Sequence, residues 1–225
     1  MKILSVNSGL PRTVEWHGRE VLTGIFKSPV AGPVPLRRLN LDGDAQADLA
    51  NHGGIAKAVY AYPSEHYSFW QTRLPALAGL PAAELPPGAF GENLTTEGLL
   101  ETHACIGDHF RAGTAVLMVT QPRIPCYKLG IRLGRDEIVQ EFLRSNRSGI
   151  YFAVIEEGVV RAGDAIERVH PDPRAIPVAG INRLYWNFRG DGDKSLLRRA
   201  LEIQALGPGI RKHFQELTTR RGSSS

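Results

Sequence analysis

The chain has 225 residues, of which 42% are hydrophobic and 22% are charged, with a formal net charge of +4. These values are ordinary for a globular chain with one sizeable core, and no apolar run is long enough to cross a bilayer. Two cysteines are too few for a disulfide framework, so we expect a reduced protein in the cytoplasm.

Glycine and proline punctuate the first 170 residues at short intervals, a pattern typical of many short strands. Apolar and β-branched runs predict strands at 3–7, 20–26, 34–40, 58–62, 114–120, 151–155 and 165–169. Strands and helices do not alternate regularly, which argues against a doubly wound sheet. We therefore predict a mainly β fold, with a closed or sandwiched core and peripheral helices.

Two helices are expected among these strands. The first begins near Pro63 and places on one face the side chains of Tyr67, Trp70, Leu74 and Leu77. The second is expected to be capped by Asp136 and to bury Ile138, Val139, Phe142 and Leu143.

The chain changes character after residue 177. Apolar residues recur at helical spacing in 178–188, 196–203 and 210–217, which predicts three helices. We expect Ser195 to cap the second of these helices and Gly207-Pro208 to end it. The predicted organisation is a β domain at 1–172, a three-helix domain at 173–221 and a disordered tail at 222–225.

The excess positive charge lies in this last part of the chain. Residues 1–180 carry 18 Lys and Arg against 19 Asp and Glu, a net charge of −1. Residues 181–225 carry 9 against 4, a net charge of +5. Such a surface suits an acidic partner, or it is a solvated helical face. No DNA- or RNA-binding motif accompanies the charge, so we do not expect nucleic acid as a partner.

Cys126 stands between two cationic side chains, Arg123 and Lys128. The apolar run before it predicts a buried strand, whereas Pro122 and Pro125 lack the N–H that a central ladder needs. We therefore expect the chain to leave the sheet here and to present Cys126 on a rigid loop. The flanking charges favour the thiolate, the form that attacks electrophiles and binds metals, and the alternative is a small buried hydrophobe.

Two glycine-containing segments could also contact a ligand. His52 and Lys57 flank a turn at Gly53 and Gly54 that permits close approach of the backbone. A glycine hairpin with surface charges is the alternative there. In the second segment, Glu92 and Asn93 could hold a polar heterocycle or pin a loop.

Other motifs are interpreted as structural or are missing. Asp108 is expected to close a turn, and Cys105 lies in an apolar segment without flanking cations, so we expect it to be structural. The seven histidines show no zincin or zinc-finger spacing, and the Gly-x-Ser-x-Gly elbow of hydrolases is absent. No histidine is tied by sequence to Cys126, which disfavours a Cys-nucleophile hydrolase.

Taken together, these segments resemble the MOSC domain (molybdenum cofactor sulfurase C-terminal domain) in its stand-alone YiiM-like branch. The C-terminal unit resembles the short three-α domain that follows MOSC in such proteins. The motifs occur in the family's order, namely His52-Gly53-Gly54, Lys57-Ala58-Val59-Tyr60, Gly91-Glu92-Asn93-Leu94, Gly107-Asp108 and Gln121-Pro122-Arg123-x-Pro125-Cys126-Tyr127-Lys128-Leu129. The segments 25–30 and 43–48 also fit that branch.

The resemblance implies a β-barrel-like core that binds molybdenum cofactor, a molybdenum held by a pterin dithiolene with a phosphate tail. It places Cys126 as the protein ligand of the metal and the catalytic residue, and a soft thiolate suits such a metal. The phosphate and the pterin need cations, backbone donors and polar side chains. The candidates are Lys27, His52, Gly53, Gly54, Lys57, Glu92, Asn93, Arg123 and Lys128.

The resemblance also implies reduction of N-hydroxylated compounds, such as hydroxylaminopurines, to amines. The cofactor performs the redox step while the protein positions it. No flavin, haem or Cys-rich iron–sulfur motif is present in the sequence, so an external electron-donor protein is expected. Its candidate dock is the +5 C-terminal unit, with Arg198, Arg199, Arg211 and Lys212. Two alternatives are a sulfur carrier with a persulfide on Cys126 and a non-enzymatic carrier of the cofactor.

Overall fold

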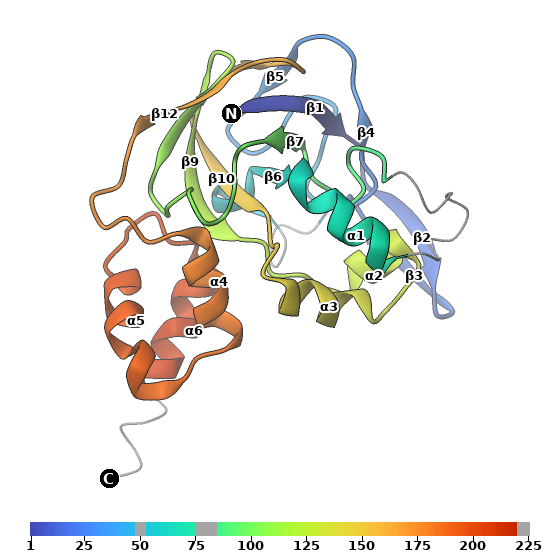
Figure 1. Ribbon diagram of the computed structural model, residues 1–225. Helices are drawn as coiled ribbons and strands as arrows, with labels where there is room; N and C mark the ends of the chain where they lie inside the picture. The colour runs from blue at the N-terminus through green and yellow to red at the C-terminus, as the bar shows by residue number, and fades with distance from the viewer. Residues whose placement is uncertain (48–52, 75–84, 220–225) are drawn as a thin grey trace.

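The computed structural model describes residues 1–47, 53–74 and 85–219. Strands are the main regular elements in the described part of residues 1–170, and helices α4 to α6 follow them (Figure 1). The strands are β1 (Lys2–Ser8), β2 (Arg12–Trp16), β3 (Arg19–Thr23), β4 (Ser28–Pro29), β5 (Val34–Leu36), β6 (Val59–Pro63), β7 (Leu94–Glu97), β8 (His109–Ala112), β9 (Ala115–Pro122), β10 (Ile150–Glu156), β11 (Gly158–Val160) and β12 (Ile166–His170). The helices are α1 (Tyr67–Arg73), α2 (Tyr127–Leu133), α3 (Ile138–Ser145), α4 (Val178–Trp186), α5 (Lys194–Leu201) and α6 (Pro208–Thr219), with short 3₁₀ segments η1 (Ile55–Lys57), η2 (Ser64–His66) and η3 (Gly190–Asp193).

One large sheet organises the β part. Its order is β12-β8-β9-β10-β6-β7-β1-β4. Neighbouring strands run antiparallel, except that β6 and β7 pair in parallel with Ala61 opposite Leu94. Two further pairs, β5 with β11 and β2 with β3, stand beside this sheet.

The first residues of β1 lie beside the segment just before β12, the strand at the opposite end of the sheet. The amide of Ile3 donates to the carbonyl of Asp164 at 2.9 Å, and the amide of Gly163 donates to the carbonyl of Ile3 at 2.8 Å. Lys2 forms an isolated bridge with Ala165, immediately before β12. The fold class is therefore as predicted, although a bridge rather than a continuous ladder joins the two ends.

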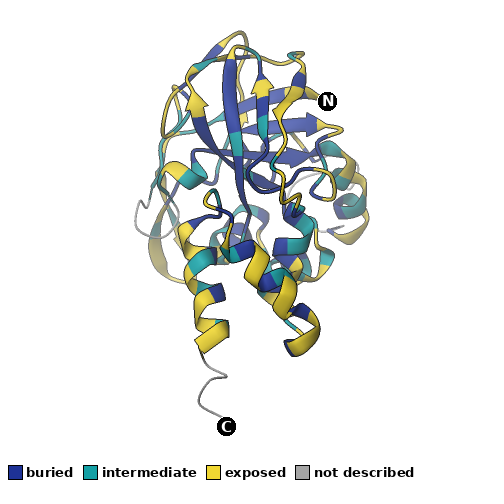
Figure 2. Cartoon of the chain, turned by 90° about the vertical axis from the view of Figure 1, so that its left-hand side faces the viewer, coloured by how far each residue is buried: buried dark blue, intermediate teal, exposed yellow. Residues whose placement is uncertain are grey.

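The larger core cluster extends from the sheet into the C-terminal helices. Ile3, Phe110 and Phe152 belong to it, and so do Ile181 of α4 and Phe214 of α6. Figure 2 shows buried residues along the strands and on the inward faces of these helices, with exposed residues outward. The helices thus bury apolar surface against the sheet, which stabilises their position. Division of the chain into two domains at residue 172 stays a prediction.

A second cluster is aromatic and lies beneath α1 and α3. Trp70 stacks on Phe142 with ring centroids 5.5 Å apart, and its indole N–H donates to the Tyr62 hydroxyl at 2.6 Å. Leu74 and Ile138 are also buried. The predicted inner faces of both helices are confirmed at these positions, whereas Val139 and Leu143 are half-buried. Leu77 lies outside the described residues.

Each predicted strand falls on an observed one, but two were predicted too long. β3 ends at Thr23, and β5 ends at Leu36, where the amide of Arg37 turns to donate to the carbonyl of Asn40 at 2.8 Å. The prediction also missed short strands, β2, β4, β7, β8 and β11, and the helix α2. These elements have two to seven residues, which is too short for periodicity to identify them.

The sequence suggested that the sheet would end before Pro122, but the strand continues to that residue. β9 includes Pro122, which lies opposite Ile150 of β10. Pairing between β8 and β9 has already stopped at Met118, so one side of β9 has no ladder at Pro122. The missing N–H is therefore tolerated there. The chain leaves the sheet at Arg123 instead.

The expected helix caps are wrong. The Asp136 carboxylate lies 2.8 Å from His17 Nε2, and Glu137 is the N-cap residue of α3 without a side-chain cap bond. Ser195 lies inside α5, whose N-cap residue is Asp193. α5 already ends at Leu201, so Gly207-Pro208 begins α6 rather than ending α5. Proline suits the first position of a helix because no N–H is needed there.

Candidate functional site

Cys126 lies at the end of the loop that follows β9 and is the N-cap residue of α2, with an extended φ of −131°. Its side chain is half-buried, and it forms no disulfide. The loop was predicted, but α2, a helix of seven residues, was not. A position before the first turn of a helix favours a thiolate.

Cys126 forms part of the wall of a hollow, which we call the cationic hollow. Its volume is about 120 Å³. Six of the predicted site residues line it, namely Lys27, Lys57, Asn93, Arg123, Cys126 and Lys128. They come from the β3–β4 connection, η1, the residue before β7, the β9–α2 loop and the first turn of α2, so the fold gathers groups that are far apart in the sequence.

Arg123 is the most deeply buried of these cations, with 7% of its surface exposed. Its guanidinium donates to the carbonyl of Phe90 and lies over the Tyr60 ring, 5.0 Å from the centroid. An arginine keeps its charge even when buried. Its charge and that of an ionised Cys126 stabilise each other. Arg123 is therefore a fixed positive charge beside the thiol.

Lys27 and Asn93 are tied together through Asp44, which the sequence did not single out as a site residue. Lys27 forms an ion pair with Asp44, and Asn93 Nδ2 donates to the same carboxylate at 2.7 Å. Asn93 Oδ1 accepts the amide of Tyr60 at 3.1 Å. Both edges of the Asn93 amide are thus engaged within the protein. Asp44 lies in the segment 43–48 that supported the family resemblance, which was the available signal for it.

Glu92 lies outside the cationic hollow and is fully buried. Its carboxylate accepts the amides of Gly88 at 2.8 Å and Phe90 at 3.0 Å, the Thr95 hydroxyl at 2.9 Å, and the Tyr67 hydroxyl. Burial raises the pKa of Glu92. This carboxylate pins the loop, the other possibility that the sequence left open, and contact of Glu92 with a ligand stays a prediction.

The glycine turn stands beside the cationic hollow rather than on its wall. Gly54 has a φ of 91°, a conformation that favours glycine, and its amide donates to Gln46 Oε1 at 2.7 Å. Gln46 does line the hollow, so the turn is held against it. Gly53 is half-buried and is not among the lining residues. His52 lies outside the described residues.

A second hollow, of about 240 Å³, lies on another side of Cys126. It shares with the cationic hollow the residues Lys57, Ile124, Cys126 and Tyr151. Its remaining wall comes partly from helices α4 and α6, through Tyr185 and Ile210. Sequence reasoning did not foresee this hollow, because its wall combines segments that are more than 80 residues apart.

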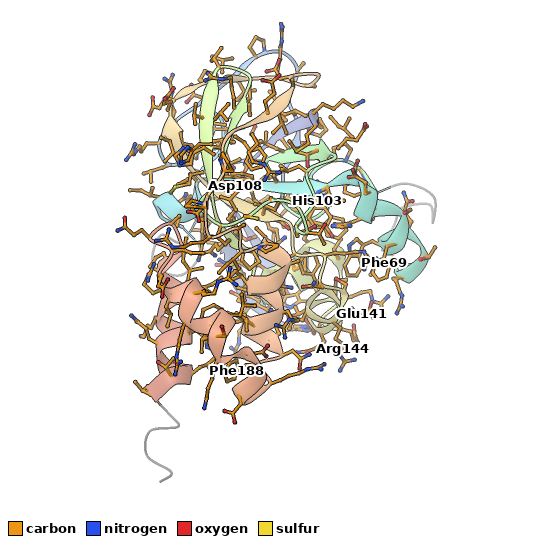
Figure 3. All side chains as sticks on the ribbon, turned by 60° about the vertical axis from the view of Figure 1, so that its left-hand side comes forward. Phe69, His103, Asp108, Glu141, Arg144 and Phe188 are labelled. Carbon is orange, nitrogen blue, oxygen red and sulfur yellow. The ribbon has the colours of Figure 1, made fainter. Side chains whose placement is uncertain are left out.

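Cys105 lies away from both hollows, as expected for a structural cysteine. Its amide donates to Asp108 Oδ2 at 3.0 Å, and the amide of Asp108 donates to its carbonyl at 3.0 Å, so Asp108 closes the predicted turn. Figure 3 labels Asp108 within the sheet part of the molecule, well apart from Phe188 among the C-terminal helices. Burial, together with the charge of Asp108, raises the pKa of the Cys105 thiol.

Among the described residues, no three His, Cys, Asp or Glu side chains gather in a way that could hold a metal ion. No helix within the described ranges is long and apolar enough to cross a membrane.

Comparison with known proteins supports the family resemblance. The family model of the MOSC domain matches residues 48–167. Protein YflK of Bacillus subtilis (strain 168) is 41% identical over 218 residues, which cover 97% of this chain and 95% of YflK. Protein YiiM of Escherichia coli (strain K12) is 41% identical over 172 residues, which cover 76% of this chain and 75% of YiiM.

Two further similarities concern a named activity and a solved structure. A protein named Reductase from Gibberella moniliformis is 35% identical over 171 residues, which cover 74% of this chain but 29% of the fungal protein. The crystal structure of YiiM from Geobacillus stearothermophilus has a TM-score of 0.77 and 35% identity, covering 96% of this chain and 97% of that one. The structural likeness therefore includes the C-terminal helices.

Proposed function

The chain belongs to the MOSC domain family, and on that premise we propose that it is a molybdenum-cofactor-dependent oxidoreductase that reduces N-hydroxylated compounds to amines. The observation that carries this proposal is the half-buried Cys126 thiol in a hollow lined by four cationic side chains. A similar fungal protein is named a reductase, which agrees with the reaction class.

The residues of the cationic hollow fit molybdenum cofactor. Cys126 offers one soft thiolate, and the cofactor brings its own sulfur ligands and the two-electron redox chemistry. Lys57, Arg123 and Lys128 offer positive charge to a phosphate. Lys27 contributes less, because Asp44 already neutralises it. Asn93 holds the wall in place, since its amide is bound to Asp44 and Tyr60.

The overall reaction breaks the N–O bond of R–NHOH. Two electrons and two protons convert it to R–NH₂ and water, and the electrons come from a separate donor protein. Tyr151 and Lys57 line both hollows, so they can hold the hydroxyl oxygen by hydrogen bonds while the bond breaks. Burial raises the pKa of Tyr151, which keeps the phenol protonated as a donor. We place this activity in the cytoplasm, where both thiols stay reduced.

An external electron donor is proposed to dock on the basic C-terminal unit. Of the four cationic residues considered for docking, Arg211 is already engaged within the protein. It donates to the carbonyl of Leu201 at 2.6 Å and to that of Ile203. Arg211 therefore joins α6 to the end of α5 and is structural. Arg199 also donates to a carbonyl, that of Arg174, at 2.9 Å. Arg198 and Lys212 are exposed and remain the best candidates for docking.

Metal and pterin content test the proposed function. Wild type, Cys126→Ser and the control Cys105→Ser should be purified anaerobically from a host that makes the cofactor. We expect about stoichiometric molybdenum in wild type and control, its loss in Cys126→Ser, and reduction of hydroxylaminopurine by wild type with a dye reductant. Bound pterin without turnover would favour a cofactor carrier. Cyanide-labile sulfur on Cys126, with neither metal nor pterin, would favour a sulfur carrier.

A further inference from the structure

Two arginines from distant segments meet at the ring of Phe26. The guanidinium carbon of Arg12, on β2, lies 3.9 Å from the ring centroid, and that of Arg132, on α2, lies 5.5 Å from it. The β2–β3 hairpin accordingly stands beside α2 (Figure 1). A cation over an aromatic ring is attracted by the negative face of the ring, so Phe26 holds two positive charges near each other.

These two charges have no counter-charge in direct contact. Neither guanidinium forms a hydrogen bond or an ion pair with a residue that the structure describes. Burial lowers the pKa of Arg132, an effect that the attraction of Glu92 opposes and the repulsion of Arg12 increases. The oxygens of Glu92 already accept hydrogen bonds within the protein. Because arginine keeps its charge at neutral pH, an added anion would be stabilised beside this pair.

The outer nitrogens of both guanidiniums are accessible to a ligand. Arg132 is half-buried, and Nε is the atom of its guanidinium that is enclosed without a partner. Its two terminal nitrogens also have no hydrogen-bond partner in the described part of the chain, but they are not enclosed, so solvent reaches them. Arg12 is exposed. The N–H groups of a guanidinium form a fork that matches two oxygens of a phosphate.

The arginine pair adjoins the cationic hollow without belonging to its wall. Phe26 is the one residue of the described segment 23–27 that does not line the hollow. Lys128, which does line it, precedes Arg132 by four residues on α2. Side chains at this spacing start from the same face of a helix, with their Cβ atoms about 5–6 Å apart. A row of cations therefore leads from the hollow to the ring of Phe26 outside it.

We propose that Arg12 and Arg132 form a second phosphate site, which takes the outer phosphate of a diphosphate group whose inner phosphate lies in the cationic hollow. The inner phosphate is the one assigned above to Lys57, Arg123 and Lys128, so this inference rests on the phosphate-binding part of the proposed function. Lys128 stands between the two positions on α2. Two linked phosphates carry more charge than one and reach further, which matches cations that are spread over one helical turn. The site therefore selects ligands with a diphosphate over ligands with a single phosphate.

Calorimetric titration with inorganic phosphate and with pyrophosphate tests this site on the full-length protein, purified from a host that does not make molybdenum cofactor. The variants are Arg132→Met and Arg12→Met, each of which removes one charge and keeps a long side chain. The matched control Arg19→Met removes the same charge from an exposed position beside the turn of the β2–β3 hairpin. We expect wild type and control to bind pyrophosphate at least about tenfold more tightly than phosphate, and both variants to lose most of this preference.

Binding of the single phosphate places the inner site. It should weaken in Lys57→Met and stay unchanged in Arg132→Met, and the reverse result would overturn the inference. Equal binding of the two ions by wild type, binding of neither ion, or a preference for pyrophosphate that is the same in variants and control would also overturn it. Thermal unfolding shows whether a variant is folded, and the exposed Arg12→Met still tests the site if Arg132→Met does not fold.

The second phosphate site and the proposed function can fail separately. If pyrophosphate is preferred as expected but protein from a cofactor-making host holds no molybdenum, the proposed function fails and the site at Arg12 and Arg132 stands. If molybdenum is bound and N–OH compounds are reduced, but wild type shows no preference for pyrophosphate, the second phosphate site alone is wrong.

Discussion

Lys27 and Asp44 form an ion pair in which the two side chains are 9% and 6% exposed. The pair joins the segment after β3 to the segment before η1 on the wall of the cationic hollow. Asn93 extends it by donating to the same carboxylate. Burial lowers the pKa of Lys27, and the attraction of Asp44 opposes that effect. The pair therefore fixes the wall, and Lys27 offers little charge to an anion in the hollow.

Removal of one partner of this pair should be strongly destabilising. In Asp44→Asn the buried ammonium of Lys27 loses its counter-charge, so we expect a loss of about 3 kcal/mol in the free energy of unfolding, measured by urea denaturation. The double variant Lys27→Met/Asp44→Asn should be less destabilised than Asp44→Asn alone. The control Asp42→Asn breaks an exposed pair with Arg37 and should cost under about 1 kcal/mol. Equal losses in the two Asp variants would contradict this account.

Glu92 should make stability depend on pH. Because its pKa is raised by burial, the folded state binds more protons than the unfolded state between about 4.5 and the raised pKa. The free energy of unfolding should therefore fall as pH rises through that window. The positive charges of Lys27 and Arg132 interact with the Glu92 carboxylate, so these two residues also influence the pH dependence.

Urea denaturation at a series of pH values measures this effect. Glu92→Gln removes the titrating group and should lack that part of the pH dependence, whereas the exposed control Glu97→Gln should keep it. A wild-type profile parallel to that of Glu92→Gln would show that the buried carboxylate does not titrate in this range.

The two thiols should differ in their reaction with iodoacetamide. Cys126 is half-buried beside Arg123, whereas Cys105 is buried and its pKa is raised by burial and by Asp108. We expect the folded, cofactor-free protein to be alkylated at Cys126 at least about tenfold faster, because the thiolate is the reacting form. Peptide mass spectrometry after timed quenching measures both rates. In guanidinium chloride the two rates should become similar, and a difference that persists there would have another cause.

Gly207→Ala should disturb the start of α6. The added Cβ atom would lie 1.8 Å from Gln121 Oε1, so the carboxamide or the helix must shift. We expect a loss of about 1–3 kcal/mol in the free energy of unfolding, the usual cost of overpacking. In the double variant Gly207→Ala/Gln121→Ala the shortened side chain removes the clash. Adding Gln121→Ala to Gly207→Ala should therefore lower the free energy of unfolding by less than Gln121→Ala does in the wild type. A double-mutant cycle from thermal unfolding tests this, and additive losses would argue against the contact.

Charge reversal on the C-terminal helices should separate docking from chemistry. Arg198→Glu/Lys212→Glu should slow turnover with a protein electron donor about tenfold or more at low salt, with little change when a dye supplies the electrons. Raising the ionic strength should shrink the difference. An equal fall with the dye reductant would contradict docking at these residues. Arg211 is left unchanged because it holds α5 and α6 together.

The regular part of the fold was predictable because long, apolar segments carry their own periodicity. β1, β6, β9 and β10 and helices α3, α4 and α6 were all found this way. Short elements such as β7 and α2 were missed, since pairing and packing rather than local pattern determine them. Helix caps were misassigned because a side chain such as Asp136 finds a partner that is distant in sequence, here His17.

The candidate site was predictable where motifs pointed to single residues. Cys126, Arg123 and Lys57 were identified from the sequence, and they line one hollow. The sequence did not predict the burial of Glu92 or the pairing of Lys27 with Asp44, because both depend on which segments the fold brings together. The second hollow depends on the same kind of long-range contact, through α4 and α6.

The walls of the two hollows have different origins along the chain. Most residues of the cationic hollow lie before residue 130, whereas Tyr185, Gly209 and Ile210 of the second hollow lie after residue 180, beyond the segment 48–167 that matches the family model. Recombination or drift in the last quarter of the gene would therefore reshape the second hollow while most of the wall of the cationic hollow stays intact.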